Sequence, residues 1–300
     1  MSGPGACYCR FSNLLNIVLV IDVKQGITRH EHEETLRLAG LRAAAYLGEA
    51  GRAPAPDHVD RFEVHGLSGS PREGADLPGV VYVYMLLSQG LLHDTYLYGH
   101  DVKNLLPTMI SATEVMDGAI VSGNCVSACD KNTTYHHQNN PIIGELFRRD
   151  GTDLRFLGTI VANANVTLQD KIRSAEYAVK LAALLGPDGA VISKEGFGNP
   201  DADAMMYCKG LEEKGIRTVI ITDEFAGVDG ASQSLADTTP EADAVISTGN
   251  ANERILLPAM ERVIGDMRVI ERIAGGVSGS LSRDGIRVEL QAILGATNEL

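Results

Sequence analysis

The sequence has few basic residues and no long apolar run, and each shortage argues against a class of protein. Its 26 lysines and arginines stand against 39 aspartates and glutamates, so the formal net charge is −13. Such a charge argues against nucleic acid or an anionic membrane as the main partner. No run approaches the ~20 apolar residues of a membrane span, and Met1–Phe11 lacks the apolar core of a secretory signal. We therefore expect neither nucleic-acid nor membrane binding.

Disulfide frameworks and nucleotide-binding motifs are also lacking. The five cysteines are odd in number and unevenly spaced, which is typical of a reducing cytoplasm rather than of a disulfide scaffold. No G-x-G-x-x-G follows a predicted strand and no P-loop is present, so the usual signatures of nucleotide binding are missing. What is present is a chain of 300 residues that is 44% hydrophobic, enough for a sizeable core in one large domain or two ordinary ones.

The second half of the chain alternates between predicted strands and helices. Short β-branched apolar runs predict strands, and amphipathic stretches between them predict helices. Strands separated by helices imply an α/β fold with a doubly wound, three-layer parallel sheet, which we place at about residues 151–265. The predicted strands are 156–162, 189–193, 218–222 and 244–248, and the predicted helices are 170–185, 201–214 and 252–264.

The first half is predicted to form a smaller α/β part. Continuous apolar runs at Ile17–Val23 and Val80–Leu87 predict two buried strands. Between them, the spacing of leucine and alanine predicts a helix over Arg29–Leu47, and residues 48–79 are rich in glycine, proline and charge and are expected to be irregular.

Polar side chains follow the predicted strands of the second half. Ligands in open α/β sheets bind outside the carboxyl ends of the strands. Helix capping is the competing interpretation, above all for Asp201 and Asn252, and paired acids there could hold Mg²⁺, although nothing in the spacing requires it. The expected substrate-binding residues are Asn163, Glu195, Asn199, Asp223 and Glu224.

A polar stretch at Ser122–Pro141 lies between the two halves. It contains Cys125, Cys129, His136 and His137, and polar clusters on loops often carry chemistry. Three interpretations compete. The stretch is a surface loop with unreactive thiols; or it binds zinc, although adjacent histidines match the usual spacing poorly; or the Cys125 thiol attacks the preceding carbonyl in an N-to-S shift. In the third case elimination and hydrolysis cut the chain and leave a pyruvoyl group. Spacing alone does not select among them.

Several long strings of the sequence resemble one family, the pyruvoyl-forming precursor of component B of glycine/sarcosine/betaine reductase. The resemblance covers about residues 17–300 and implies that the chain is cut between Asn124 and Cys125, which becomes the pyruvoyl cofactor. Residues 1–124 and 125–300 would then be separate chains. Family members carry a longer N-terminal region, so this chain looks shortened. The strings are Asp117–Cys125 (DGAIVSGNC), Cys129–Asn132 (CDKN), His137–Pro141 (HQNNP), Glu195–Asp201 (EGFGNPD), Asp229–Asp237 (DGASQSLAD) and Gly295–Leu300 (GATNEL).

The resemblance implies one subunit of a cytoplasmic, oligomeric reductase that deaminates an amino acid in anaerobic metabolism. The pyruvoyl carbonyl would capture the amine of glycine or sarcosine as an imine. A selenocysteine-containing component B subunit would supply the nucleophile, and a carrier selenoprotein would take up the product. The resemblance assigns Cys125 as the pyruvoyl source and Asn124 as the residue at the cut, and His136 or His137 are candidate proton carriers.

Other functions remain open from the sequence. D-proline reductase uses similar pyruvoyl chemistry on a ring amine. An uncleaved structural or binding subunit is a second alternative, and a zinc-binding α/β protein is a third. Betaine has a quaternary nitrogen that cannot form an imine, so a betaine-specific member should not need the pyruvoyl group. For a single site to form, the stretch 122–141 must meet the carboxyl ends of the second-half strands, with Cys125 beside some of the expected binding residues.

Overall fold

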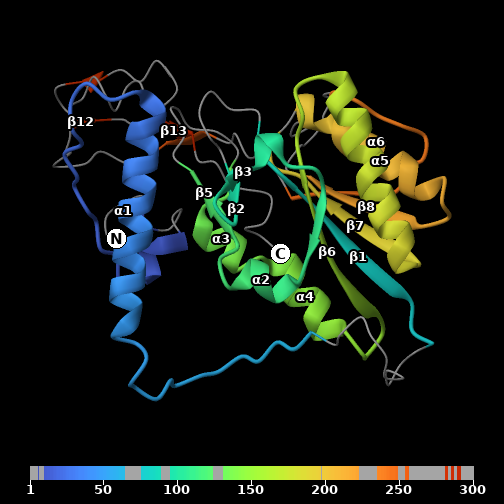
Figure 1. The fold of residues 1–300 in the computed structure, drawn as a ribbon, viewed down its shortest axis with the longest axis horizontal. Helices are drawn as coiled ribbons and strands as arrows, with labels where there is room; N and C mark the ends of the chain where they lie inside the picture. Colours follow the sequence, from blue (N-terminus) through green and yellow to red (C-terminus); the bar gives the residue numbers. More distant parts are fainter. Residues whose placement is uncertain are drawn as a thin grey trace.

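The computed structural model describes residues 6, 10–64, 76–88, 95–123, 131–196, 198–222 and 235–248, and the backbone of a few short strand segments beyond residue 250. Figure 1 shows a twisted sheet with helices on both sides and a long helix, α1, standing beside it. The helices are η2 (Arg10–Asn13), α1 (Arg29–Glu49), η3 (Val102–Asn104), α2 (Ala112–Met116), α3 (Thr134–Gln138), α4 (Pro141–Arg149), α5 (Leu168–Leu185) and α6 (Asn199–Glu212). The strands are β1 (Gly79–Leu86), β2 (Thr95–Leu97), β3 (His100–Asp101), β4 (Thr108–Ile110), β5 (Ile120–Ser122), β6 (Arg155–Asn163), β7 (Gly189–Ser193), β8 (Arg217–Thr222), β9 (Val245–Ser247), β10 (Arg254–Leu256), β11 (Leu281–Ser282), β12 (Gly285–Ile286) and β13 (Glu289–Gln291).

The central sheet has six strands in the order β4-β6-β1-β7-β8-β9. All neighbours pair in parallel except β4, which is antiparallel to β6 at the edge. If the parallel strands are counted along the chain from β1, their order is 2-1-3-4-5, one of the two common doubly wound arrangements. The chain reverses its direction of winding between β1 and β7, and this switch point is where such sheets bind ligands.

Both faces of the sheet are covered, which is why β1 is apolar along its whole length. Val81, Val83 and Met85 point to the side of α5 and α6, where they join one core cluster. Tyr82 and Tyr84 point to the other side and pack with residues of α2 and α4. This arrangement confirms the predicted three-layer α/β fold.

The predicted strands and helices between residues 151 and 248 are found within about two residues of their expected bounds. The sheet itself extends beyond the range in which we placed it, since β1 and β4 come from before residue 124. The helix predicted at 252–264 is wrong at its start, because Arg254–Leu256 is strand β10, which pairs with β13. The rest of that predicted helix lies outside the described residues.

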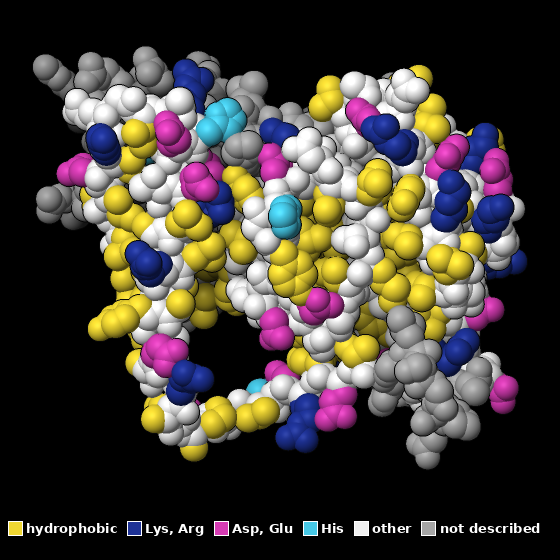
Figure 2. Space-filling view, viewed as in Figure 1, with side chains coloured by type: hydrophobic (Ala, Val, Ile, Leu, Met, Phe, Trp, Pro, Cys, Tyr) yellow, Lys and Arg dark blue, Asp and Glu magenta, His cyan; other side chains and the backbone are white. Residues whose placement is uncertain are grey.

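The predicted strand at Ile17–Val23 is wrong. These residues have no regular secondary structure, and Val18 and Val20 are 81% and 92% exposed. An apolar run becomes a strand only when another strand satisfies its backbone groups, and none of the described strands pairs with it. The predicted helix at Arg29–Leu47 is confirmed as α1. The structure shows that it begins with a capping box at Thr28 and that Glu33 is its one buried residue. Figure 2 shows hydrophobic side chains exposed along this helix.

Helices α5 and α6 pack closely at Gly210. A Cβ atom there would lie 2.7 Å from Cγ2 of Val179 on α5. We expect Gly210→Ala to lower the stability of the protein, because overpacking costs about 1–3 kcal/mol and outweighs the gain of roughly 1 kcal/mol in helix propensity. Gly144→Ala on α4 is the matched control, since no atom lies within 4 Å of its Cβ position. Denaturant unfolding should show Gly210→Ala below the wild type and Gly144→Ala at or above it; equal stability of the two variants would contradict this packing.

Candidate functional site

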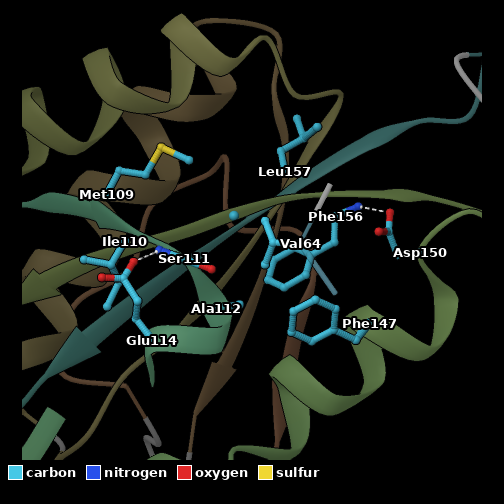
Figure 3. Close-up of a pocket in the computed structure, with 11 residues that line it drawn as sticks. Val64, Met109, Ile110, Ser111, Ala112, Glu114, Phe147, Asp150, Phe156 and Leu157 are labelled. Atoms are coloured by element: carbon cyan, nitrogen blue, oxygen red, sulfur yellow. Dashed lines mark hydrogen bonds between the residues drawn. The ribbon is translucent and has the colours of Figure 1, made fainter. Parts of the chain in front are cut away.

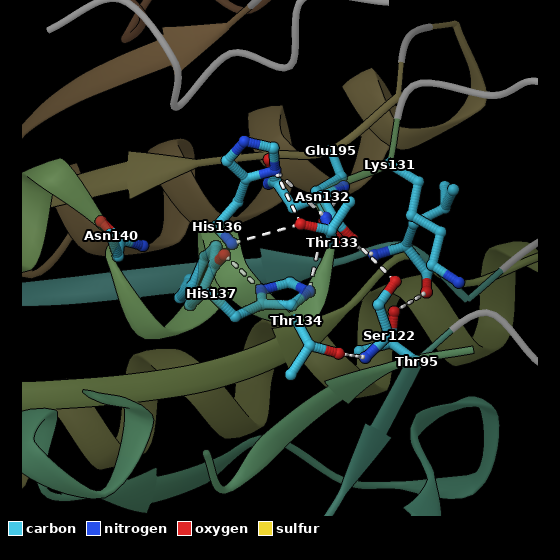
Figure 4. Close-up of polar contacts among 12 residues, drawn as sticks. Thr95, Ser122, Lys131, Asn132, Thr133, Thr134, His136, His137, Asn140 and Glu195 are labelled. Carbon is cyan, nitrogen blue, oxygen red and sulfur yellow. Dashed lines mark hydrogen bonds and ion pairs between the residues drawn. The ribbon is translucent and has the colours of Figure 1, made fainter. Parts of the chain in front are cut away.

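The carboxyl ends of β1 and β7 meet at the buried side chain of Glu195. Its Oε2 atom accepts a hydrogen bond of 2.6 Å from the backbone N–H of Leu87, directly after β1. Its Oε1 atom accepts one of 2.9 Å from the backbone N–H of Asn132, in the polar stretch between the two halves. Figure 4 shows this carboxylate beside the residues of that stretch. The carboxylate therefore ties three segments together at the switch point of the sheet.

The residues that flank segment 124–130 are hydrogen-bonded to one another. The Lys131 Nζ atom donates to the backbone oxygen of Gly123 at 2.9 Å. Ser122 donates from its Oγ to the backbone oxygen of Asn132 at 2.7 Å, and its N–H donates to Thr134 Oγ1 at 3.1 Å. Asn124, Cys125 and Cys129 lie outside the described residues. The described ends of the polar stretch nevertheless meet the carboxyl ends of the strands.

His137 faces Glu195 from the other side. It lies on α3, whose first turn is capped by Thr133. Its Nδ1 atom is 2.7 Å from the Tyr84 hydroxyl, and its Nε2 atom is 3.8 Å from Glu195 Oε1. Among the described residues, Nε2 has no hydrogen-bond partner although it is buried. Because Nε2 faces a carboxyl group, we assign the imidazole proton to it and the hydrogen bond at Nδ1 to the Tyr84 hydroxyl as donor.

Burial shifts the protonation of these groups in opposite directions. It raises the pKa of Glu195 to about 7, although the N–H groups of Leu87 and Asn132 and the charge of Lys131 oppose the shift. Burial, followed by the charge of Lys131, lowers the pKa of His137 to about 3, so its imidazole is neutral at pH 7. Burial also raises the pKa of Tyr84 well above its ordinary value, so the phenol stays protonated. Glu195 is thus the member of this group that titrates near neutral pH.

A second polar network lies beside this group, at the end of β6 and the start of α6. Lys171 forms a buried ion pair with Asp203, which also accepts from the N–H of Asn165 at 3.1 Å. Lys194 is 2.8 Å from Asp201, whose other oxygen accepts from the N–H of Ala236 at 2.7 Å. These ion pairs fix the loops around the strand ends. Asp201 is therefore not the N-cap that the sequence suggested, since the cap position of α6 is Gly198.

The other predicted site residues fall around these two networks. Asn163 is buried at the end of β6, where it donates to the Val102 carbonyl and accepts from Ser174. Asn199 opens α6, and its carbonyl accepts from Lys171 at 3.0 Å. His136 contributes to the cap of α3 through Thr133. Asp223 and Glu224, like Asn252, lie outside the described residues. Glu195 and His137 are the predicted residues that the structure brings face to face.

The sequence reasoning missed three functional candidates that the structure adds to this group, Lys131, Asn132 and Tyr84. The first two stand in the CDKN string, but nothing in the spacing linked them to Glu195. The signal for Tyr84 was present in the strand VVYVYMLL, where two tyrosines recur at alternate positions. A buried tyrosine needs a partner for its hydroxyl, and two tyrosines on one face of a strand therefore indicate a polar cluster beneath.

A separate apolar pocket of about 230 Å³ lies near the start of β6 and beside β4. Phe147, Phe156 and Met109 line it (Figure 3). Both acidic side chains that line it accept hydrogen bonds from the backbone. Glu114 accepts from the N–H of Ser111, and Asp150 accepts from the N–H of Phe156. This pocket offers no reactive group comparable to the Glu195 group.

The described part of the chain contains neither a metal-binding cluster nor a helix that could cross a membrane. No group of three or more His, Cys, Asp or Glu residues there could hold a metal ion. The predicted zinc ligands Cys125 and Cys129 lie outside this part, so the zinc alternative stays a prediction. Within the same residues, no helix is both long and apolar enough to pass through a lipid bilayer.

Comparison with known proteins places the whole chain in one family. Residues 1–300 match the family described as glycine/sarcosine/betaine reductase component B subunits. The chain is 55% identical over its full length to the glycine reductase complex component B subunits alpha and beta of Peptoclostridium acidaminophilum and of Acetoanaerobium sticklandii, and it covers 70% of each. It is 50% identical over 99% of its length to the sarcosine reductase complex component B subunit alpha of Peptoclostridium acidaminophilum, of which it covers 70%. No solved structure matches. The chain belongs to the family of glycine/sarcosine/betaine reductase component B subunits.

Proposed function

We propose that this chain is the substrate-capturing subunit of a glycine or sarcosine reductase and that its Asn124–Cys125 bond is cut to form a pyruvoyl group. The observation that carries the proposal is the family match over residues 1–300, with 55% and 50% identity to glycine and sarcosine reductase subunits. The names of the glycine reductase relatives give two subunits, alpha and beta, for one protein. A cut within the chain is consistent with those names.

The proposed cut needs only Cys125, its preceding carbonyl and water. The thiol sulfur adds to the Asn124 carbonyl carbon as the peptide C–N bond breaks, which gives a thioester and a free amine on residue 125. Elimination then breaks the bond between Cβ and sulfur and leaves a dehydroalanine. Its hydrolysis releases ammonia and gives the pyruvoyl group, while hydrolysis of the thioacid releases hydrogen sulfide and leaves a carboxylate on Asn124. No oxidant or reductant is required.

The described residues fit such a site. Glu195 titrates near neutral pH, so it can give or take a proton where the segment begins and ends. The buried Nε2 atom of His137 has no hydrogen-bond partner among the described residues, as expected for a group that meets another species during the reaction. Lys131 adds a positive charge beside the carbonyl of Gly123. These groups would position the reacting segment and move protons around it.

The pyruvoyl group, when formed, would supply an electrophilic carbonyl that captures the substrate amine as an imine. Partner subunits, one of them with selenocysteine, would supply the nucleophile, because this chain contains none. Asn163, Asn199, Asp223 and Glu224 remain proposed substrate-binding residues. The oxygens of Glu195 already accept hydrogen bonds from Leu87 and Asn132, which favours a structural role for it beside the substrate.

Maturation should give fragments of 124 and 176 residues (300 − 124 = 176). We expect two bands on a denaturing gel, and intact mass spectrometry should show that the larger fragment lacks the Cys125 amine and thiol. Only the larger fragment should react with a hydrazide, because it bears the new carbonyl. A single uncut chain after both aerobic and anaerobic purification would contradict the proposal and favour an uncleaved binding subunit.

A further inference from the structure

Two segments near the start of the chain expose apolar side chains to solvent. In Ile17–Val23, the side chains of Val18 and Val20 are 81% and 92% exposed. Helix α1 exposes further large apolar side chains, among them Leu38 at 50% and Tyr46 at 80%. Both segments lie at the edge of the molecule, apart from the central sheet (Figure 1). We call Ile17–Val23 and α1 together the N-terminal face. Exposed apolar patches of this kind mark interaction sites.

Helix α1 contacts the rest of the molecule through a polar cluster in its first half. The buried carboxylate of Glu33 lies 3.1 Å from Nε of Arg37 and accepts a hydrogen bond of 3.1 Å from the Tyr96 hydroxyl. The Arg37 guanidinium lies 3.6 Å from the centre of the Tyr96 ring. Most of the stability of a helix in a protein comes from packing of its apolar side chains. This cluster fixes the side of α1 that faces the body, but it leaves Leu38 and Tyr46 exposed.

The segment Ile17–Val23 has the sequence of a strand but no strand beside it. Its residues, IVLVIDV, have high β propensity, and none of the described strands pairs with it. Because alternate residues of a strand face the same side, Val18 and Val20 would form one apolar row. An added strand can pair with exposed backbone groups while its side chains cover such a row. The N-terminal face is therefore suited to a partner that supplies a β-strand and apolar side chains.

The relatives of this chain are longer than the part that it matches. The 301 matched residues are 70% of the glycine reductase protein of Peptoclostridium acidaminophilum, so about 130 of its residues lie outside the match (301/0.70 − 301). An alignment of 301 residues that takes in the whole chain has no room for so long an insertion. The further region therefore flanks the match. A region of this size is large enough to form a domain with strands of its own.

We propose that the N-terminal face binds the further region that these relatives carry. A strand of that region pairs with Ile17–Val23, and its apolar side chains cover Leu38 and Tyr46 of α1. The proposal goes beyond the proposed function, because the residues that carry it all precede Asn124 and none takes part in the cut. A second copy of this chain is disfavoured as the occupant, since the net charge of −13 opposes self-association.

Hydrogen–deuterium exchange measures the proposed pairing directly. In the 300-residue chain, the amides of residues 17–23 should exchange rapidly, because none of the described strands pairs with them. In the full-length Peptoclostridium acidaminophilum relative, the amides aligned with residues 17–23 should exchange about a hundredfold more slowly or less. The amides aligned with α1 should also slow. Equally rapid exchange of the 17–23 segment in both proteins would overturn the proposal.

A chimera tests whether the further region is what covers the face. It joins that region of the relative to this chain in the order in which the relative has them. Val20→Lys should raise the unfolded fraction of the chimera by about tenfold or more, because it removes a valine from an apolar contact. In the 300-residue chain the same substitution should have no measurable effect, since Val20 is 92% exposed there. Denaturant unfolding provides both measurements, and equal effects in the two proteins would contradict the proposal.

Leu184→Lys is the matched control for the chimera. Leu184 is 83% exposed on α5, which lies on the opposite side of the molecule from α1 (Figure 1), so this substitution should leave both proteins unchanged. If the chimera does not fold, the exchange measured in the natural full-length relative still decides the matter. Light scattering tests the other occupant. A dimer of the 300-residue chain that Val20→Lys separates would make a second copy the occupant and overturn the proposal.

Discussion

The Cys125→Ala variant is expected to remain one uncut chain of 300 residues and to form no carbonyl group. Alanine has no nucleophile for the Asn124 carbonyl and no leaving group on its Cβ, so both the shift and the elimination are blocked. The loss of cutting should be complete on a denaturing gel, and reductase activity in the reconstituted complex should vanish with it. Circular dichroism should remain that of the wild type, because none of the described strands contains Cys125.

Cys129→Ala is the matched control, since it removes a thiol four residues away in the same polar stretch. Cutting at the wild-type rate is expected. Equal loss of cutting in both variants would point to a role that the two thiols share, such as binding zinc. Cutting that persists in Cys125→Ala would place the reactive bond elsewhere and contradict the assignment of Cys125.

The segments 17–23 and 80–87 show what the sequence could and could not predict. Both are continuous runs of β-branched and apolar residues, and both were predicted as buried strands. Val80–Leu86 lies in the centre of the sheet, whereas Ile17–Val20 is largely exposed. The local sequence pattern shows which secondary structure a segment can adopt. Whether the segment is buried in a sheet depends on neighbours that are distant in sequence. The pairing of β1 with both β6 and β7 is such a long-range event.

The candidate site likewise contains features that the sequence predicts and features that it does not. Glu195 and His137 could be named because polar residues after strands and in polar loops stand out from their surroundings. Their contact at 3.8 Å could not be predicted, because it depends on where α3 packs against the sheet. Tyr84 was hidden within an apolar strand, and its hydrogen bond to His137 appears only when the two segments meet. The sequence shows which types of residue are present, whereas the contacts that each of them makes depend on the fold.

The fragment 125–300 expressed alone is expected not to fold, because the central strand of its sheet belongs to the other fragment. Strand β1 lies between β6 and β7, and its side chains from Val81 to Leu86 are at most 1% exposed. Burying each such side chain contributes roughly 1.5–3 kcal/mol, so the six together contribute about 9–18 kcal/mol. That is as large as the ~5–15 kcal/mol by which a whole protein is stable.

Co-expression of residues 1–124 in trans should restore a folded complex, and this is the control for the fragment experiment. In the matured wild type, the two fragments should elute as one species under native conditions and separate only in denaturant, because separation would expose β6 and β7 along their full paired edges. Circular dichroism and cooperative thermal unfolding of the fragment 125–300 provide the measurement. A cooperatively folded fragment in the absence of residues 1–124 would show that β6 and β7 can pair without β1, and the described topology would then not be obligatory.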